Sequence, residues 1–534
     1  MRNNIILISI ILIIYIPLSL LDYNHFPFSD GAEHGAAVRE LAKNLIHPED
    51  PMLANHSGNS PRFVPSTLLM AICMRLLHLD VLITLKVFLV FFFSFFLVSA
   101  TLFSRQYFKD TAQAPWSLAT LLFLWGLGWT GANAYMFSAI LYTAYFPSVV
   151  SFSLSLLALY FQLRFLQSFK TRFLIVEIIC GSLAFINHPL TGTFFFICSG
   201  LIYIEKRSFE KKMMFCYVLS VLAALSLTAL WPYYSFFTNF SKIASGQMAQ
   251  TADYQSTHQY LYSKFFIRSG PALLGIPFVI LFLWQKRYLL LVGSFAFFSL
   301  FYLAGYLFKI SLAERFVFFI MFALQMSFSR ICREWFLQSA STLDQNVKRI
   351  IAWFFPLFLI IGIGIQLVLV YTKFITPAFE HTAGFTFPKY VSPNTMQMEL
   401  RKHLCEGDVV LSDIYSSWSI PVYTGAKVIA LFHTPPNVDD NSERIKAVET
   451  VYDGDTSSEE RMKILKEYGV THIFLNYKIT GEDIKPALQE MGFSVIAQNE
   501  SFCLFSVFRT THNPQLEPRI ENAIPVSRIT NSHT

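Results

Sequence analysis

Long apolar runs separated by short charged stretches constrain this chain more than any other feature. After a first run from Ile5 to Leu21, others follow at about 63–79, 82–104, 115–131, 148–166, 173–186, 190–204, 213–232, 269–284, 288–308, 313–330 and 351–372. Several approach 20 residues, about the length at which a helix crosses roughly 30 Å of hydrocarbon. The sequence therefore predicts an α-helical polytopic membrane bundle.

The composition supports a membrane class and excludes a nucleic-acid partner. Hydrophobic residues make up 54% of the 534 residues and charged residues 14%, whereas soluble domains carry about 25% charged residues. The net charge of +6 comes from short Lys and Arg clusters between apolar runs. Because these clusters form no continuous basic stripe, they indicate membrane topology and not a nucleic-acid surface.

The basic clusters also predict which loops share a side of the membrane. Basic loops face the cytoplasm, and the clusters are Arg164/Lys170/Arg172, Lys206/Arg207/Lys211/Lys212, Lys286/Arg287, Arg330/Arg333 and Lys348/Arg349. Residues 22–62 and everything after Tyr371 are then extracytoplasmic. The first run is predicted to be an uncleaved span with a cytoplasmic N-terminus, because Leu18-Ser-Leu-Leu-Asp22 is a poor cleavage site. The predicted location is the cell (inner or plasma) membrane.

The number of spans stays open between 11 and 13. Between residues 62 and 147, the number of membrane crossings agrees with the predicted sides of the loops only under one of two alternatives. In the first, the run 63–79 enters the membrane part of the way. In the second, the segment 131–147 stays at the surface, and the same segment also fits a short span.

The composition changes at about Pro377 and predicts a small C-terminal α/β domain. Strands are expected at 409–411, 427–431, 472–475 and 502–508, and helices at 457–468 and 483–491. The predicted division is a membrane bundle at 1–376, an extracytoplasmic α/β domain at 377–510 and a disordered tail at 511–534. In an oxidising compartment, Cys405 and Cys503 either pair as a disulfide or stay free.

The segment after the first span concentrates titratable groups at the membrane surface. Phe26-Pro-Phe-Ser-Asp30-Gly-Ala-Glu33-His34 places two carboxylates and an imidazole within five positions. Apolar residues then recur at helical spacing and predict an amphipathic interfacial helix: Val38, Leu41, Ala42, Leu45 and Ile46.

Two readings of the two acids are compatible. In a capping box, the Asp30 side chain accepts from the Glu33 amide while Glu33 reaches back. In a catalytic site, a carboxylate in a water-poor niche gains proton affinity and acts as a general base.

This arrangement resembles the GT-C superfamily of membrane glycosyltransferases, which includes protein mannosyltransferases and aminoarabinose transferases and uses polyprenyl-phosphate-linked sugars. The resemblance covers the topology of most of the chain and one short motif, Ser29-Asp30-Gly31-Ala32-Glu33-His34. It implies that Asp30 is the catalytic base or a metal-linked acid, with Glu33 and His34 beside it. The two-acid motif with one residue between the acids, common in such enzymes, is absent here. A divalent metal therefore stays an open alternative, and no metal ligand is assigned.

A leaving lipid phosphate requires positive charge near the outer membrane surface. Arg315 is the best candidate, because Ala313-Glu-Arg-Phe316 opens a span at the predicted outer boundary. Other candidates for the donor phosphate are Arg268, Lys264 and His188, and Arg62 is a further cation near this boundary. The structural alternative is that Arg315 snorkels or pairs with Glu314, and that His188 serves the turn it occupies.

The sequence thus predicts a membrane glycosyltransferase that moves a sugar from a polyprenyl-phosphate donor to a glycan, lipid or protein acceptor on the outer face. One alternative is a non-catalytic transporter or flippase of lipid-linked glycans. Against it, few charges lie inside the predicted spans and no paired broken helices are visible. Another is a polymerising enzyme of the O-antigen-ligase type, which would place its key residues in a large late loop.

Overall fold

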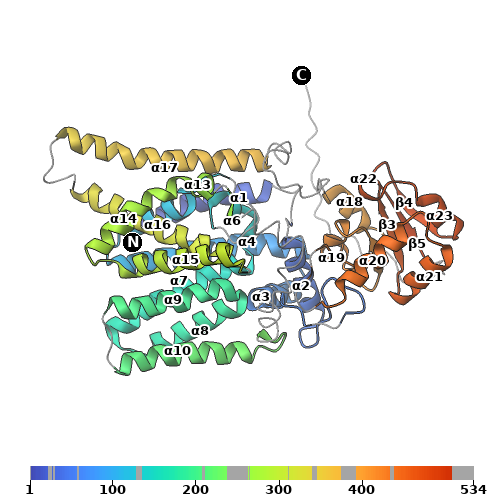
Figure 1. Cartoon of the computed structure of the whole chain (residues 1–534), viewed down its shortest axis with the longest axis horizontal. Helices are drawn as coiled ribbons and strands as arrows, with labels where there is room; N and C mark the ends of the chain where they lie inside the picture. Colours follow the sequence, from blue (N-terminus) through green and yellow to red (C-terminus); the bar gives the residue numbers. More distant parts are fainter. Residues whose placement is uncertain are drawn as a thin grey trace, which may run out of the picture.

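The computed structural model describes residues 2–21, 27, 30–56, 59–127, 135–206, 211–236, 262–263, 265–310, 312–338, 345–374, 393–432, 434 and 438–507. The bundle consists of α1 (Arg2–Leu21), α2 (Gly31–Lys43), α3 (Pro65–Leu77), α4 (Val81–Phe108), α5 (Gln113–Phe123), α6 (Phe137–Thr143), α7 (Pro147–Ser168), α8 (Thr171–Asn187), α9 (Pro189–Glu205), α10 (Lys211–Ala229), α13 (Phe265–Ser269), η2 (Gly270–Gly275), α14 (Ile276–Trp284), α15 (Leu289–Phe308), η3 (Ala313–Phe316), α16 (Val317–Gln338) and α17 (Gln345–Phe374). Figure 1 shows these helices running roughly side by side, with a small α/β domain beyond one end of the bundle. The predicted fold class, a helical membrane bundle with a small C-terminal sheet domain, is confirmed.

Six helical segments in the described part of the chain are long and apolar enough to cross a membrane. They are Val81–Phe108, Pro147–Ser168, Lys211–Ala229, Phe265–Trp284, Leu289–Phe308 and Ala313–Trp335. Shorter apolar helical segments lie at Ile8–Ser19, Pro65–Leu77, Pro189–Glu205 and Leu357–Tyr371. Helix α6 has 7 residues, which at about 1.5 Å per residue is too short to span a bilayer. The total of 11 to 13 spans stays a prediction.

Two of the basic clusters, Lys286/Arg287 and Arg330/Arg333, meet at the end of the bundle away from the α/β domain (Figure 1). Arg330 and Arg333 both pair with Asp110, and Arg287 pairs with Glu334. This grouping agrees with the loop pattern derived from the sequence. Which end faces the cytoplasm stays a prediction.

The C-terminal domain has a five-stranded mixed sheet in the order β2-β1-β3-β5-β4. Strand β1 pairs in parallel with β2 and β3, and β5 pairs antiparallel with β3 and β4. The elements are α18 (Pro393–Leu400), β1 (Val409–Ser412), η5 (Ser416–Trp418), α19 (Ile420–Thr424), β2 (Lys427–Val428), α20 (Asn441–Tyr452), α21 (Ser458–Glu467), β3 (His472–Asn476), α22 (Tyr477–Thr480), α23 (Lys485–Glu490), β4 (Ser494–Gln498) and β5 (Phe502–Ser506).

The predicted strands and helices of this domain are confirmed within a few residues, although β2 is shorter than expected. Helix α21 begins as its sequence predicts, because the Ser457 hydroxyl accepts from the Glu460 amide at 3.2 Å. It ends at Glu467, and Gly469, just beyond the C-cap Tyr468, has a φ of +66° that suits a residue without a side chain. The sequence did not predict β4 or the helices α18, α19, α20 and α22. The predicted disordered tail, 511–534, lies outside the described residues.

Residues 52–54, which follow α2, pair with strand β2 at the edge of this sheet. Leu53 forms a parallel bridge with Val428, the Ala54 amide donates to the Val428 carbonyl at 2.9 Å, and the Val428 amide donates to the Met52 carbonyl at 2.8 Å. The Lys427 ammonium pairs with Glu40 at 2.8 Å. The N-terminal segment and the C-terminal domain therefore share one sheet edge. They also share one core, which runs from the bundle to sheet residues such as Val410 and Phe474.

Three sequence expectations are corrected here. Helix α2 ends at Lys43, and Ile46 is 78% exposed beyond it. The predicted polar face of α2 is divided: Lys43 and Asn44 are exposed, whereas Glu40 is buried against Lys427 and Arg39 donates to the Val422 carbonyl at 3.0 Å. The C-terminal domain covers the Arg39 and Glu40 side of that face, which a helical pattern cannot reveal. Cys405 and Cys503 are free thiols, the first exposed and the second buried in β5, so the disulfide alternative is wrong.

Candidate active site

Helix α2 starts at Asp30 without the predicted capping box. Asp30 occupies the N-cap position, but its side chain makes no capping hydrogen bond. Its carbonyl accepts from the His34 amide at 3.0 Å, as the first turn of a helix requires. The expectation that Asp30 and Glu33 cap each other is therefore wrong. The reason is that Glu33 forms an ion pair with Arg62 instead.

The Glu33–Arg62 ion pair joins α2 to the segment that leads into α3. The Glu33 side chain is 2% exposed and the Arg62 side chain 23%. Although burial acts to lower it, the carboxylates of Glu33 and Asp30 raise the pKa of Arg62 above its ordinary value. Arg62 therefore stays charged between two acids. The sequence had indicated Arg62 only as a further cation near the membrane boundary.

His34 is buried next to the two acids and is held neutral. Its ring meets Phe146 edge to face, with centroids 5.1 Å apart. Desolvation and the Arg62 charge lower the pKa of His34 to about 3, against the opposite effect of Asp30. Within the described residues, His34 Nδ1 makes no hydrogen bond. A neutral imidazole with so low a pKa is a poor proton acceptor near neutral pH.

His188 lies between α8 and α9 and caps α9 with its own ring. Its Nδ1 accepts from the Thr191 amide at 3.2 Å and lies 2.8 Å from the Thr191 hydroxyl. Desolvation, Arg315 and Arg62 lower the pKa of His188 to about 3. A neutral ring that accepts at Nδ1 carries its proton on Nε2. His188 thus has one N–H left to donate to a ligand.

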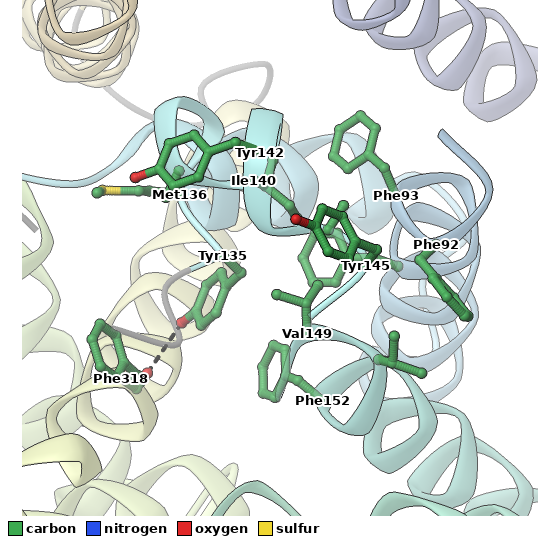
Figure 2. Packing of buried hydrophobic residues seen from close by; sticks show 14 of the residues in the cluster. Phe92, Phe93, Tyr135, Met136, Ile140, Tyr142, Tyr145, Val149, Phe152 and Phe318 are labelled. Carbon is green, nitrogen blue, oxygen red and sulfur yellow. Dashed lines mark hydrogen bonds between the residues drawn. The ribbon is translucent and has the colours of Figure 1, made fainter. Parts of the chain in front are cut away.

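Arg315 lies in η3 and lines a small recess at the same end of the bundle. The other lining residues are Tyr135, Phe152, Leu190, Thr191, Phe318 and Phe319. Figure 2 shows Tyr135 and Phe152 from two segments, with the Tyr135 hydroxyl bonded to the Phe318 carbonyl at 3.2 Å. Arg315 Nε is buried and makes no hydrogen bond in the described part of the chain. A guanidinium with an unused N–H beside a recess can receive an anionic ligand.

The other two predicted phosphate-binding residues are placed differently. Arg268, in α13, is 4% exposed. Its charge and that of the fully buried Glu314 both reach the Tyr302 hydroxyl electrostatically. Arg315, the neighbour of Glu314 in the chain, acts on His188. These electrostatic neighbours favour Arg315 over Arg268 as the residue nearest the acids. Lys264 lies outside the described residues.

Residues from four separate segments therefore converge at one end of the bundle. We name them the charged cluster: Asp30, Glu33, His34, Arg62, His188 and Arg315. Asp30 acts electrostatically on Arg62, His34 and His188, and Arg315 acts on His188. The cluster combines a half-buried carboxylate with two guanidiniums and a neutral N–H donor, groups that suit proton abstraction near a phosphate. Thr191 was missed as part of it, although it stands in the same Asn187-His-Pro-Leu-Thr191 turn.

The described residues contain no group of three or more His, Cys, Asp or Glu side chains arranged to hold a metal ion. The fit of a divalent metal to this site therefore has no geometric support among those residues.

Comparisons with known proteins give a fold. Protein-family models give no match, and neither do curated protein sequences. Among solved structures, the chain is similar to ArnT from Cupriavidus metallidurans in the apo state, with a TM-score of 0.56 and 11% identity over 94% of this chain and 97% of that one. It is also similar to ArnT from the same organism bound to undecaprenyl phosphate, with a TM-score of 0.56 and 12% identity over 96% of this chain and 99% of the other. The chain thus shares its fold with ArnT along nearly its whole length.

Proposed function

We propose that this protein is a membrane glycosyltransferase that transfers one sugar from a polyprenyl-phosphate donor to a hydroxyl-bearing glycan, lipid or protein acceptor. The observation that carries the proposal is the charged cluster. One carboxylate, Asp30, lies within electrostatic reach of Arg62 and His188 from two other segments, and Arg315 from a third lies within reach of His188. Proton abstraction and stabilisation of a leaving phosphate need these groups together.

Asp30 is proposed as the general base. Its neighbour Glu33 is paired with Arg62 and is therefore less available for proton transfer. His34, with a pKa of about 3, is too weak a base near neutral pH. Asp30 would take the proton of the acceptor hydroxyl while the acceptor oxygen attacks the anomeric carbon. The bond between that carbon and the phosphate oxygen breaks on the opposite face.

Arg315 and His188 are proposed to receive the leaving phosphate. The Arg315 guanidinium has an unused Nε–H at the recess, and His188 has its Nε2–H. Both contacts would strengthen as negative charge accumulates on the leaving oxygen, so they would lower the barrier more than they tighten donor binding. Arg62 adds charge from the side of the acids.

Two further observations support the choice of a polyprenyl phosphate as the donor. The recess beside Arg315 is mainly aromatic and lies within a membrane bundle, where a lipid-linked donor arrives through the hydrocarbon. One of the solved structures with the same fold is ArnT bound to undecaprenyl phosphate. The outer face of the cell membrane is the proposed site of transfer.

The deciding experiment incubates the purified protein with a panel of polyprenyl-phosphate sugars and acceptor hydroxyls and follows donor consumption. Wild-type protein should release polyprenyl phosphate, and Asp30→Asn should not. Transport of an intact lipid-linked glycan across vesicles, without any donor cleavage, would support the flippase alternative and reject the transferase.

The side of the membrane is tested separately. Asn55 and Lys212 are both exposed, on opposite ends of the bundle. In intact cells, a cysteine introduced at Asn55 should react with an impermeant thiol reagent, and one at Lys212 should not. The reverse pattern would move the charged cluster to the cytoplasm and exclude transfer on the outer face.

A further inference from the structure

The first turn of α2 packs directly against a tyrosine from another segment. A side-chain carbon placed on Gly31 would overlap the Tyr145 hydroxyl, with the Tyr145 ring at 3.3 Å and Pro27 at 3.2 Å. Tyr145 is 0% exposed and lies between α6 and α7. Figure 2 shows its ring among buried residues of those segments and of α4. The absence of a side chain at Gly31 thus lets the phenol reach the backbone next to Asp30.

The same phenol is also close to the C-terminal domain. Tyr423 of α19 acts electrostatically on Tyr145, and so does Asp30. Tyr423 is 3% exposed, and its carbonyl accepts from Arg39 of α2 at 3.4 Å. Gly35, one turn after Gly31, packs against Val422, the residue before Tyr423. Three segments far apart in the chain therefore meet at the start of α2.

The chemistry of Tyr145 limits what it can do there. Burial, together with Tyr423 and Asp30, raises the pKa of Tyr145 well above its ordinary value. The phenol therefore keeps its proton at any working pH and serves only as a neutral donor. The other charged or titratable groups that face Asp30 are Arg62, His34 and His188. Of these, Arg62 is cationic and both histidines are neutral N–H carriers, and the Tyr145 phenol adds a further neutral donor that suits an ionised Asp30.

We propose that Tyr145 is a positioning residue for Asp30 and that Tyr423 makes the C-terminal domain part of the same site. The inference rests on the proposed function and deepens it. The Tyr145 hydroxyl packs against the first turn of α2 at Gly31 and lies within electrostatic reach of the Asp30 carboxylate. It keeps that carboxylate ionised and oriented, while the proton taken from the acceptor goes to Asp30 and the phenol keeps its own.

The first test is Tyr145→Phe, which removes one hydroxyl and keeps the ring. A hydrogen bond to a charged group corresponds to about a ten- to one-hundredfold effect, so turnover should fall by that factor while the KM for the donor stays unchanged. The acid limb of the pH–rate profile should move to higher pH, because a carboxylate that loses a donor binds its proton more tightly. Tyr142→Phe, a buried phenol three residues earlier, is the matched control and should change neither. An unchanged acid limb in Tyr145→Phe overturns the proposal.

Tyr423→Phe tests the part played by the C-terminal domain. The Tyr423 side chain influences Asp30 only through its electrostatic effect on Tyr145, so turnover should fall less than in Tyr145→Phe. The acid limb of the pH–rate profile should move in the same direction. A wild-type profile in Tyr423→Phe removes the C-terminal domain from the proposal.

A suppression experiment separates the contact from the chemistry. Gly31→Ala should lower the thermal unfolding midpoint, because the new methyl group overlaps the Tyr145 hydroxyl. The double variant Gly31→Ala/Tyr145→Phe should recover part of that loss. If it recovers nothing, the contact is wrong and the inference fails. If wild-type protein consumes no donor at all, the proposed function fails, and the unfolding midpoints still show whether the Gly31–Tyr145 contact exists.

Discussion

The two ends of the bundle use the same residue types in different ways. At the end away from the α/β domain, Arg330 binds Glu334 at 2.8 Å and Arg333 binds Asp110 at 3.1 Å. Glu205 accepts from the Tyr107 hydroxyl at 2.9 Å and from the Leu290 amide at 2.9 Å. At the other end, Arg315 Nε and His34 Nδ1 are buried without hydrogen bonds in the described part of the chain.

The difference indicates which end stabilises the protein and which end is prepared for a ligand. Buried polar atoms are normally paired, because an unpaired one costs about 1–3 kcal/mol. At the paired end, these contacts tie α4, α9, α15 and α16 together. The charged cluster keeps unused donors beside a recess, which is typical of functional sites.

The largest contrast is expected between two aspartates. Asp30→Asn should lower turnover by about 10² to 10⁴, because an amide cannot act as a general base. Asp110→Asn, at the paired end, should lower the unfolding midpoint but leave turnover per folded molecule near wild type. Both variants are measured by donor consumption and by thermal unfolding. Equal turnover in the two variants would show that Asp30 is not the general base.

The ion pair within the charged cluster is expected to contribute to stability as well. Removing one partner of a buried pair destabilises a protein by about 3–5 kcal/mol, and the 23% exposure of Arg62 places Glu33→Gln at the lower end of that range. Glu33→Gln/Arg62→Met should be less destabilised than the sum of its single variants. Thermal unfolding of all four proteins closes the cycle. Additive losses would show that the two side chains do not stabilise each other.

Arg315 provides a smaller and more selective contrast. Arg315→Lys keeps the charge but loses the fork-shaped donor, so turnover should fall by about ten- to one-hundredfold with less effect on donor binding. Arg333→Gln, at the paired end, should leave turnover per folded molecule unchanged. Steady-state kinetics with one fixed donor measures both. Normal turnover in Arg315→Gln would assign the phosphate contact to another cation.

The smallest effect concerns pH. His34 and His188 have pKa values of about 3, below the value of about 6.5 of an unfolded chain. Between these values the unfolded state binds more protons, so stability should fall as the pH is lowered from about 6.5 toward 3. The unfolding midpoint of His34→Gln should depend less on pH in this window. His47→Gln, on an exposed residue, should keep the wild-type slope, and an identical slope in His34→Gln would show that His34 is not held neutral.

The sequence predicted the parts of the fold that depend on local pattern. Apolar run length located the bundle helices, and Ser457 with Gly469 marked the two ends of α21. It did not predict that the Arg39 and Glu40 side of α2 is covered. That side is covered by residues almost 400 positions later, such as Lys427 on Glu40, and a helical pattern carries no information about such a partner.

The candidate site residues were predicted from their positions along the chain. The prediction was incomplete because position does not show which residues the fold brings together. Asp30 and Arg315 were named because each stands at a predicted membrane boundary. Arg62 stands at such a boundary too, but its importance comes from two acids on another helix. Tyr145 was not named at all, because its role depends on the missing side chain at Gly31. Only the folded chain brings these residues together.

The shared sheet edge between residues 52–54 and Val428 has a consequence for biosynthesis. A ribosome releases the α2 segment hundreds of residues before β2 exists, so that segment waits at the membrane surface with its strand partner unmade. The edge can pair only after the C-terminal domain has been made and has folded. A nascent or truncated chain therefore holds α2 without the contacts of Glu40 and Arg39 to that domain.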